Sequence, residues 1–116
     1  MSINVFTVSG RLGQRPMLKK FPDGGQVAEF TLAHKRRGKD RATGERKPVT
    51  DWYACNLWGP LAEILCVEAI RGQVITVTGQ LAQESYERDG IQVPRPEISV
   101  ASFELGRRPA GAEGEG

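Results

Sequence analysis

One segment of the chain, residues 60–69, has the spacing of a helix, and strand-like runs lie on both sides of it. Pro60 suits the first turn of a helix, where its missing N–H would have no partner in any case. Leu61, Leu65 and Ala69 recur every four residues, and Gly72 follows as a stop signal. A helix of this length is too short for a helical bundle, so we expect a domain built mainly of strands.

Five runs of alternating apolar and polar residues have the pattern of β-strands. In the second run, for example, Ala28, Phe30 and Leu32 share one face, which indicates a half-buried strand. Glycine, proline and Asp-Gly turn signals separate the runs. The five predicted strands are residues 3–8, 27–33, 49–58, 73–81 and 97–105.

Five strands with a single helix between the third and the fourth are the order found in the oligonucleotide/oligosaccharide-binding barrel, the OB-fold. We therefore predict an all-β, five-stranded OB-fold over residues 1–106, followed by a short flexible tail over residues 107–116. Asp89-Gly90 predicts a tight turn in the hairpin before the last strand. Pro94 and Pro96 are expected to limit strand pairing beyond that turn.

The charges of the chain are unevenly distributed, although its net charge is only +2. Residues 1–50 contain eleven Lys and Arg against four Asp and Glu, whereas residues 51–116 contain five against ten. Such a protein can present one strongly positive surface to an anionic partner. The alternative is an ordinary solvated surface with no partner.

Composition argues against several other classes of protein. Cys55 and Cys66 lie eleven residues apart and His34 is the single histidine, so a zinc site lacks ligands. We find no catalytic motif and no phosphate-binding loop, and we expect neither an enzyme nor a bound cofactor. The N-terminus does not resemble a signal peptide, and no apolar run could span a membrane. We therefore expect a soluble cytoplasmic protein in which both cysteines are inert.

Two tryptophans are the first candidate binding residues. Trp52 and Trp58 lie six residues apart in one predicted strand, so they share a face with Asn56, roughly 20 Å apart at about 3.3 Å per residue. Tyr53, Cys55 and Leu57 form the more apolar face. Tryptophans in small barrels commonly belong to the core or to an interface. A pair on the polar face instead favours exposed platforms on which nucleic-acid bases stack.

Basic residues supply the second set of candidates. Residues 34–48 contain seven Lys and Arg and almost no apolar residue, which predicts a flexible loop or an extended hairpin tip. Alone, such a run is usually a solvated loop; beside an aromatic face it can neutralise phosphates. The predicted phosphate contacts are Arg11, Lys19, Lys20, Lys35, Arg36, Arg37, Lys39, Arg41, Arg46, Lys47 and Arg88.

Two further aromatic residues are weaker candidates. Tyr86 lies in the predicted hairpin before Asp89-Gly90, where an exposed tyrosine is ordinary, so stacking and structural roles remain about equally plausible. Phe21 lies beside Pro22 and is expected to pack its own loop unless it joins the stacking face.

Several short motifs occur together in an order typical of one family. They are Gly10-Arg11-Leu12-Gly13 with Pro16, Gly24-Gly25-Gln26-Val27-Ala28, Phe30-Thr31-Leu32-Ala33, Asp40-Arg41-Ala42-Thr43-Gly44-Glu45, Thr50-Asp51-Trp52, Trp58-Gly59-Pro60-Leu61-Ala62-Glu63, Arg71-Gly72 and Thr78-Gly79-Gln80-Leu81. Each motif is weak alone, but their order and spacing over residues 3–105 are specific. The sequence resembles the bacterial single-stranded DNA-binding protein family.

The resemblance implies roles for three residues. Trp52 matches a stacking tryptophan of the family, Trp58 a position usually held by a stacking aromatic, and Tyr86 a stacking aromatic in the hairpin between the last two strands. It also implies a homotetramer that acts on single-stranded DNA in replication, recombination and repair at the bacterial nucleoid.

The sequence departs from the family pattern in two places. Where many members have another stacking tryptophan, this chain has Lys35-Arg36-Arg37-Gly38, so we expect more reliance on phosphate contacts there. Residues 107–116 lack the acidic Pro-Phe tip through which many members recruit replication and repair proteins, so we do not expect that recruitment. Sequence-independent binding of single-stranded DNA is the favoured function. The alternatives are a protein-interaction module of primosome type and an RNA-binding paralogue.

Overall fold

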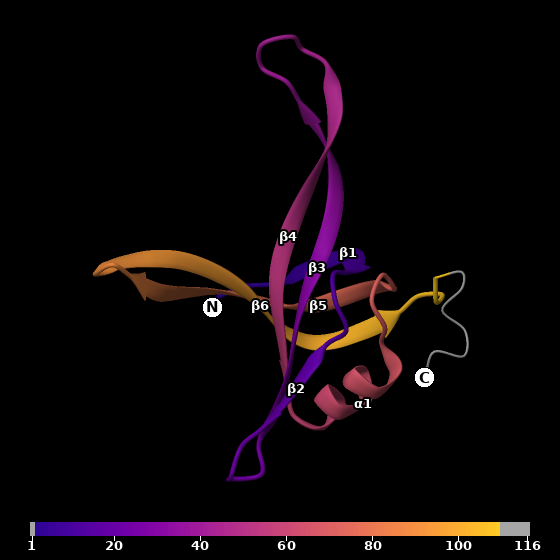
Figure 1. Cartoon of the computed structure of the whole chain (residues 1–116), viewed down its shortest axis with the longest axis vertical. Coiled ribbons are helices and arrows are strands. Elements are labelled where there is room, and N and C mark those ends of the chain that lie inside the picture. Colours follow the sequence, from indigo (N-terminus) through magenta and orange to yellow (C-terminus); the bar gives the residue numbers. More distant parts are fainter. Residues whose placement is uncertain (1, 110–116) are drawn as a thin grey trace.

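A computed structural model describes residues 2–109 of the chain, so residues 110–116 of the predicted tail lie outside the described part. It has six strands and one helix (Figure 1). The elements are β1 (Phe6–Leu12), β2 (Met17–Lys20), β3 (Gln26–Lys39), β4 (Arg46–Trp58), α1 (Pro60–Glu68), β5 (Val74–Arg88) and β6 (Ile91–Leu105).

Five of the strands close into a barrel. The order in the sheet is β1-β5-β6-β4-β3-β2, and β1 also pairs with β3 through Arg11↔Ala33 and Leu12↔Leu32, which closes the ring. The contact between β4 and β6 is a short parallel pairing that begins at Ala54↔Glu97. Strand β2 pairs only with the start of β3, so it lies beside the barrel. With α1 between the third and fourth barrel strands, the predicted all-β OB-fold is confirmed.

Alternation along the strands fills the barrel interior. Leu32, Leu57, Ile75 and Ile98, from four different strands, are almost completely buried. Their neighbours along each strand point outward, as the period of two requires. The removal of these apolar side chains from water is the main contribution to the stability of the fold.

Helix α1 covers one end of this core with most of the predicted face. Leu65 of the helix and Ala69, which follows it, are buried as predicted, whereas the third buried residue is Ala62 and not Leu61. A strict four-residue spacing drifts around a helix of 3.6 residues per turn, so the mixed spacing of three and four residues keeps better to one face. Gly59, with φ of 100°, joins β4 to α1 in a conformation that favours glycine.

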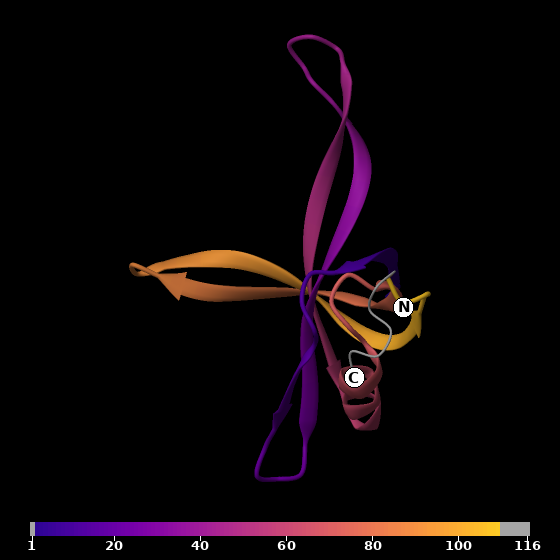
Figure 2. The same ribbon diagram turned by 45° about the vertical axis from the view of Figure 1, so that its right-hand side comes forward.

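The strands extend beyond the barrel as arms (Figures 1 and 2). We define the β3–β4 arm as residues 34–51, past the contact with β1. Its strands stay paired as far as Lys39↔Arg46. The tip is held by bonds from the Asp40 N–H to the Glu45 carbonyl and from the Gly44 N–H to the Asp40 carbonyl. Of the two predicted forms for this segment, the extended hairpin is therefore correct.

The β5–β6 arm, residues 83–96, projects in another direction (Figure 2). Asp89 and Gly90 have φ of 52° and 79° between the paired residues Arg88↔Ile91, which confirms the predicted tight turn. The expectation that Pro94 and Pro96 would limit pairing is wrong, because they pair with Ser85 and Gln83. Because the two prolines lie two residues apart, their missing N–H groups fall on the same side of β6. Pairing with β5 continues along the other side of the strand.

Candidate nucleic-acid interface

Strand β4 presents both tryptophans on the outer face of the barrel. Trp52 is 62% exposed and Trp58 is 59% exposed, whereas Cys55 and Leu57 between them are buried. The predicted assignment of faces is therefore confirmed. Tyr53, on the inner side, packs against Phe6 with ring centroids 5.5 Å apart.

Trp52 and Tyr86 line the same hollow, although they are distant in sequence. The hollow has a volume of about 470 Å³ and lies where the β5–β6 arm meets the outer face of β3 and β4. Arg95 lines the same hollow. Its lining residues are Thr31, Trp52, Tyr53, Ala54, Tyr86, Pro94, Arg95 and Pro96.

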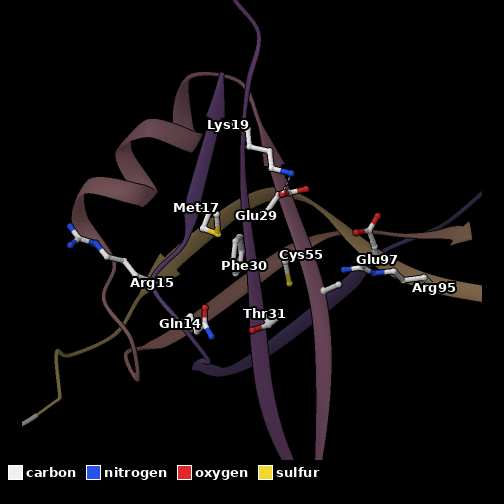
Figure 3. Close-up of a pocket in the computed structure, with 11 residues that line it drawn as sticks. Gln14, Arg15, Met17, Lys19, Glu29, Phe30, Thr31, Cys55, Arg95 and Glu97 are labelled. Atoms are coloured by element: carbon white, nitrogen blue, oxygen red, sulfur yellow. Dashed lines mark ion pairs between the residues drawn. The ribbon is translucent and has the colours of Figure 1, made fainter. Parts of the chain in front are cut away.

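A second hollow, of about 320 Å³, continues the first toward β2 (Figure 3). The two share Thr31, Ala54 and Arg95, so we treat them as one outer groove. Figure 3 shows the part toward β2, lined by Gln14, Arg15, Met17, Lys19, Glu29, Phe30, Thr31, Ala54, Cys55, Arg95 and Glu97.

The outer groove contains charges of both signs. Lys19 forms an ion pair of 2.8 Å with Glu29, and Arg95 and Glu97 lie on the β6 side (Figure 3). Because Lys19 is more than half exposed, this pair adds little to stability, and the ammonium group can turn to another anion. Prediction from sequence missed Arg95, since only the crossing of β6 over β4 brings it to the tryptophan face.

Gly13 lets the Trp52 indole lie close to the end of β1. A Cβ atom at Gly13 would come within 2.7 Å of Cζ3 of Trp52 and 2.8 Å of Oγ1 of Thr31, closer than carbon atoms pack. The Gly13 N–H donates to the Thr31 carbonyl at 3.0 Å, which fixes the backbone there. One side of the indole is thus supported while most of the ring stays exposed.

Trp58 lies at the far end of β4 and has a different neighbour. Its ring stacks on Phe21, with centroids 5.5 Å apart and planes 17° from parallel. Phe21 follows β2 directly and is 41% exposed. Of the two possibilities that the sequence left open for Phe21, packing within its own loop or a place on the stacking face, the structure shows the second.

The β3–β4 arm carries most of the predicted basic residues. The pairing of its strands distributes them along two neighbouring strands, and this arm projects from the barrel (Figure 1). Arg36 donates from Nε to Oδ2 of Asp51 at 2.6 Å, and this hydrogen bond, with the charge of Asp51, raises the pKa of Arg36. The arm residues from the predicted set are Lys35, Arg36, Arg37, Lys39, Arg41, Arg46 and Lys47.

Other predicted phosphate contacts lie outside the outer groove. Arg11 donates to the Gly72 carbonyl at 2.9 Å and, with Lys35, lines a hollow that shares no residue with the outer groove. Lys20 lies 4.0 Å from Glu63 of the helix. Arg88 lies at the tip of the β5–β6 arm. The structure thus brings Lys19 to the groove and leaves Arg11, Lys20 and Arg88 outside it.

The two cysteines and the histidine are the remaining residues with reactive side chains, and their surroundings are those of structural residues. Burial raises the pKa of the Cys55 thiol to about 12, with a smaller contribution from Glu97, and burial also raises the pKa of Cys66. His34 donates from Nδ1 to the Ser9 carbonyl at 2.7 Å. Within residues 2–109, no three His, Cys, Asp or Glu side chains are grouped as a metal site would require, and no helix is long and apolar enough to cross a membrane.

Comparison with known proteins identifies relatives over nearly the whole chain. The model of the single-strand binding protein family matches residues 3–105. A protein of Aquifex aeolicus (strain VF5) named single-stranded DNA-binding protein is 32% identical over 111 residues, which cover 96% of this chain and 75% of that protein.

Two solved structures share the fold. The Plasmodium falciparum SSB in complex with ssDNA matches with a TM-score of 0.83 and 24% identity, over 92% of this chain and 97% of that chain. A deletion mutant of the single-stranded DNA binding protein from Thermus aquaticus matches with a TM-score of 0.76 and 23% identity, over 95% of this chain and 52% of that chain. At these identities the likeness concerns the fold alone.

Proposed function

The chain belongs to the single-strand binding protein family, and on that premise we propose that it binds single-stranded DNA without sequence preference and does no chemistry on it. The observation that carries the proposal is the outer groove, in which Trp52 and Tyr86 face one hollow from two different strands. Every base has an aromatic face, so stacking on exposed rings selects unpaired strands but not their sequence.

Phosphate contacts would supply the rest of the affinity. Lys19 and Arg95 lie along the outer groove, and the β3–β4 arm places further cations beyond Trp52. Cationic side chains that neutralise phosphates release counterions, which makes binding sensitive to salt but not to sequence. Stacking rings and a cationic path together form the usual architecture for general single-strand binding.

The cellular role follows from this mode of binding. A protein that binds the open strand and not the duplex protects exposed DNA and melts hairpins by mass action. We assign it to replication, recombination and repair at the bacterial nucleoid, as a homotetramer whose binding unit is residues 1–106. Residues 107–116 would form a tail outside that unit.

A tryptophan-fluorescence titration with poly(dT), at low and high salt, tests the proposal. Because both tryptophans are more than half exposed on one face, the single strand should quench their emission strongly, and added salt should weaken binding. Duplex DNA of the same length is the control and should quench little. Absence of binding to poly(dT) at low salt would refute the proposal and favour a protein-interaction module.

Substitution of each tryptophan assigns the site. Trp52→Ala and Trp58→Ala should each weaken poly(dT) binding by about 1–3 kcal/mol, the usual contribution of base stacking. Melting temperature and molecular mass should stay close to those of the parent protein, since neither ring is buried in the chain. If either substitution unfolds the protein or splits its assembly, that tryptophan is a core or interface residue and not a stacking platform.

A further inference from the structure

Phe21 and Trp58 form a stacked aromatic pair at one end of the tryptophan face. Their ring planes are 17° from parallel and their centroids are 5.5 Å apart, the geometry of an offset stack. Both rings remain partly open to solvent, at 41% for Phe21 and 59% for Trp58. The contact therefore covers part of one face of the indole and leaves the rest exposed.

The backbone around Phe21 is firmly held. The Phe21 N–H donates to the Gly25 carbonyl at 2.8 Å, and the Gly24 N–H donates back to the Phe21 carbonyl at 3.0 Å. The Gly25 N–H also donates to Oδ1 of Asp23 at 2.8 Å. Phe21 is thus attached to a tight, closed turn at the end of the β2–β3 hairpin.

A second set of bonds ties that hairpin to the residue that follows Trp58. The Gly59 N–H donates to the Gln26 carbonyl at 3.0 Å, and Nε2 of Gln26 donates to the Gly59 carbonyl at 3.1 Å. Val27 and Trp58 are register partners between β3 and β4. The two rings are therefore held by backbones that are fixed relative to each other.

An exposed indole with no neighbour would occupy several side-chain rotamers. Ordering such a side chain on binding has an entropic cost that lowers affinity. Trp52 is supported by Gly13 and the end of β1. The only aromatic ring stacked on Trp58 among the described residues is that of Phe21.

We propose that Phe21 is a positioning residue of the single-strand site, which covers one face of the Trp58 indole and orients the other toward a base. This inference rests on the proposed function, because it assigns Phe21 a part in the same binding event. It adds to the site a residue that acts through Trp58 and not by its own contact with DNA.

The test uses the full chain in a Trp52→Phe background, where Trp58 is the only tryptophan. Phe21→Leu keeps an apolar side chain but removes the ring, and Phe21→Tyr keeps the ring. Without DNA, Phe21→Leu should increase quenching of Trp58 by acrylamide. With poly(dT), it should weaken binding about three- to tenfold, the effect of leaving one large side chain to be ordered on binding. Phe21→Tyr should stay within about twofold of the background protein, because the stack persists.

Leu61→Ala is the matched control. Leu61 is as exposed as Phe21, at 41%, but it belongs to α1 and has no aromatic ring to stack on Trp58. If loss of apolar surface alone caused the effect, Leu61→Ala would show it as well. Because the effect is expected to come from the stacked ring, we expect this variant to leave acrylamide quenching and poly(dT) affinity unchanged.

Each contrary outcome has a distinct meaning. If neither the parent protein nor the Trp52→Phe protein binds poly(dT), the proposed function itself fails. If the Trp52→Phe protein binds with Trp58 quenched and Phe21→Leu changes nothing, the positioning role alone is refuted. Weaker binding with unchanged acrylamide quenching would show that Phe21 contacts DNA directly, and unfolding of Phe21→Leu would show a purely structural role; either result overturns the inference.

Discussion

The Trp52 indole lies against Gly13, at a point where a larger side chain does not fit. In Gly13→Ala the new methyl group should push the indole aside, since the ring is the more mobile partner. We expect poly(dT) binding to weaken by about 1 kcal/mol, within the contribution of one base stack, with little change in melting temperature. A fluorescence titration measures the affinity.

A double substitution separates this effect from a general disturbance of the barrel. Gly13→Ala should have almost no further effect on affinity in a Trp52→Ala protein, because the ring that it displaces is gone. Equal losses in both backgrounds would mean that Gly13 acts through the fold and not through Trp52.

Cys55 predicts a dependence of stability on pH in the alkaline range. The folded state keeps the thiol protonated up to a pKa of about 12, from a usual value of 9.0. Between these pH values the unfolded chain binds fewer protons, so unfolding becomes easier as the pH rises. The stabilisation is complete below pH 9 and declines above it, by at most about 1.4 kcal/mol per pH unit.

Urea unfolding at pH 8 and pH 10.5 measures this decline, with Cys55→Ala as the control. Lysines and tyrosines titrate in both proteins, so the difference between the two slopes belongs to the thiol. Identical slopes would show that the thiol of Cys55 does not titrate differently in the folded and unfolded chains.

Among single residues, the sequence predicted those whose face of the sheet follows from the alternation of side chains along a strand. Trp52 and Trp58 on one face and Cys55 and Leu57 on the other follow from a period of two within one strand. Arg95 was not predictable as a groove residue, because its position depends on how β6 crosses β4. The contact of Phe21 with Trp58 likewise depends on the register between β3 and β4.

At the scale of elements, the β3–β4 arm holds cations in two different states. Arg36 is paired with Asp51, whereas neither Arg37 nor Lys39 has a carboxylate oxygen within 4.0 Å in the described chain. Phosphate contacts by the unpaired cations should dominate the salt dependence of binding. Arg37→Gln with Lys39→Gln should lower the slope of log affinity against log salt by about 0.7 for each phosphate that is no longer neutralised.

Arg36→Gln is the matched control within the same arm. It removes one charge but also frees Asp51, whose carboxylate then repels the strand, so affinity should fall at low salt. A slope that the double substitution does not change would exclude Arg37 and Lys39 from phosphate binding.

The number and order of the barrel strands were predictable because alternation and turn signals are local. The length of the arms was not. Residues 34–39 contain almost nothing apolar, so no hydrophobic pattern indicated a strand, yet each pairs with a partner from residue 46 onward. On the buried side of the helical segment, Leu65 and Ala69 were predicted correctly, but the small Ala62 was missed and the apolar Leu61 is exposed.

At the scale of the whole molecule, the described chain leaves apolar side chains exposed at separate places. Ile3 is 82% exposed, and Val67 of α1 is 67% exposed. Assembly of several chains would remove some of this surface from water. We expect a homotetramer, with four times the 12.7 kDa of one chain. Light scattering after size-exclusion chromatography measures the mass, and a monomer at micromolar concentration would contradict the expectation.

Trp52 and Trp58 lie on one continuous strand, so their separation of roughly 20 Å is fixed by the backbone. On the proposed function they are therefore two binding points on a rigid spacer, and an oligonucleotide would be a multivalent ligand for them. A strand stacked as in a duplex advances about 3.4 Å per nucleotide, so roughly six nucleotides connect the two rings, and fewer if the strand is extended. Shorter oligonucleotides would then occupy one ring at a time, whereas longer ones would gain the effective concentration that comes from tethering.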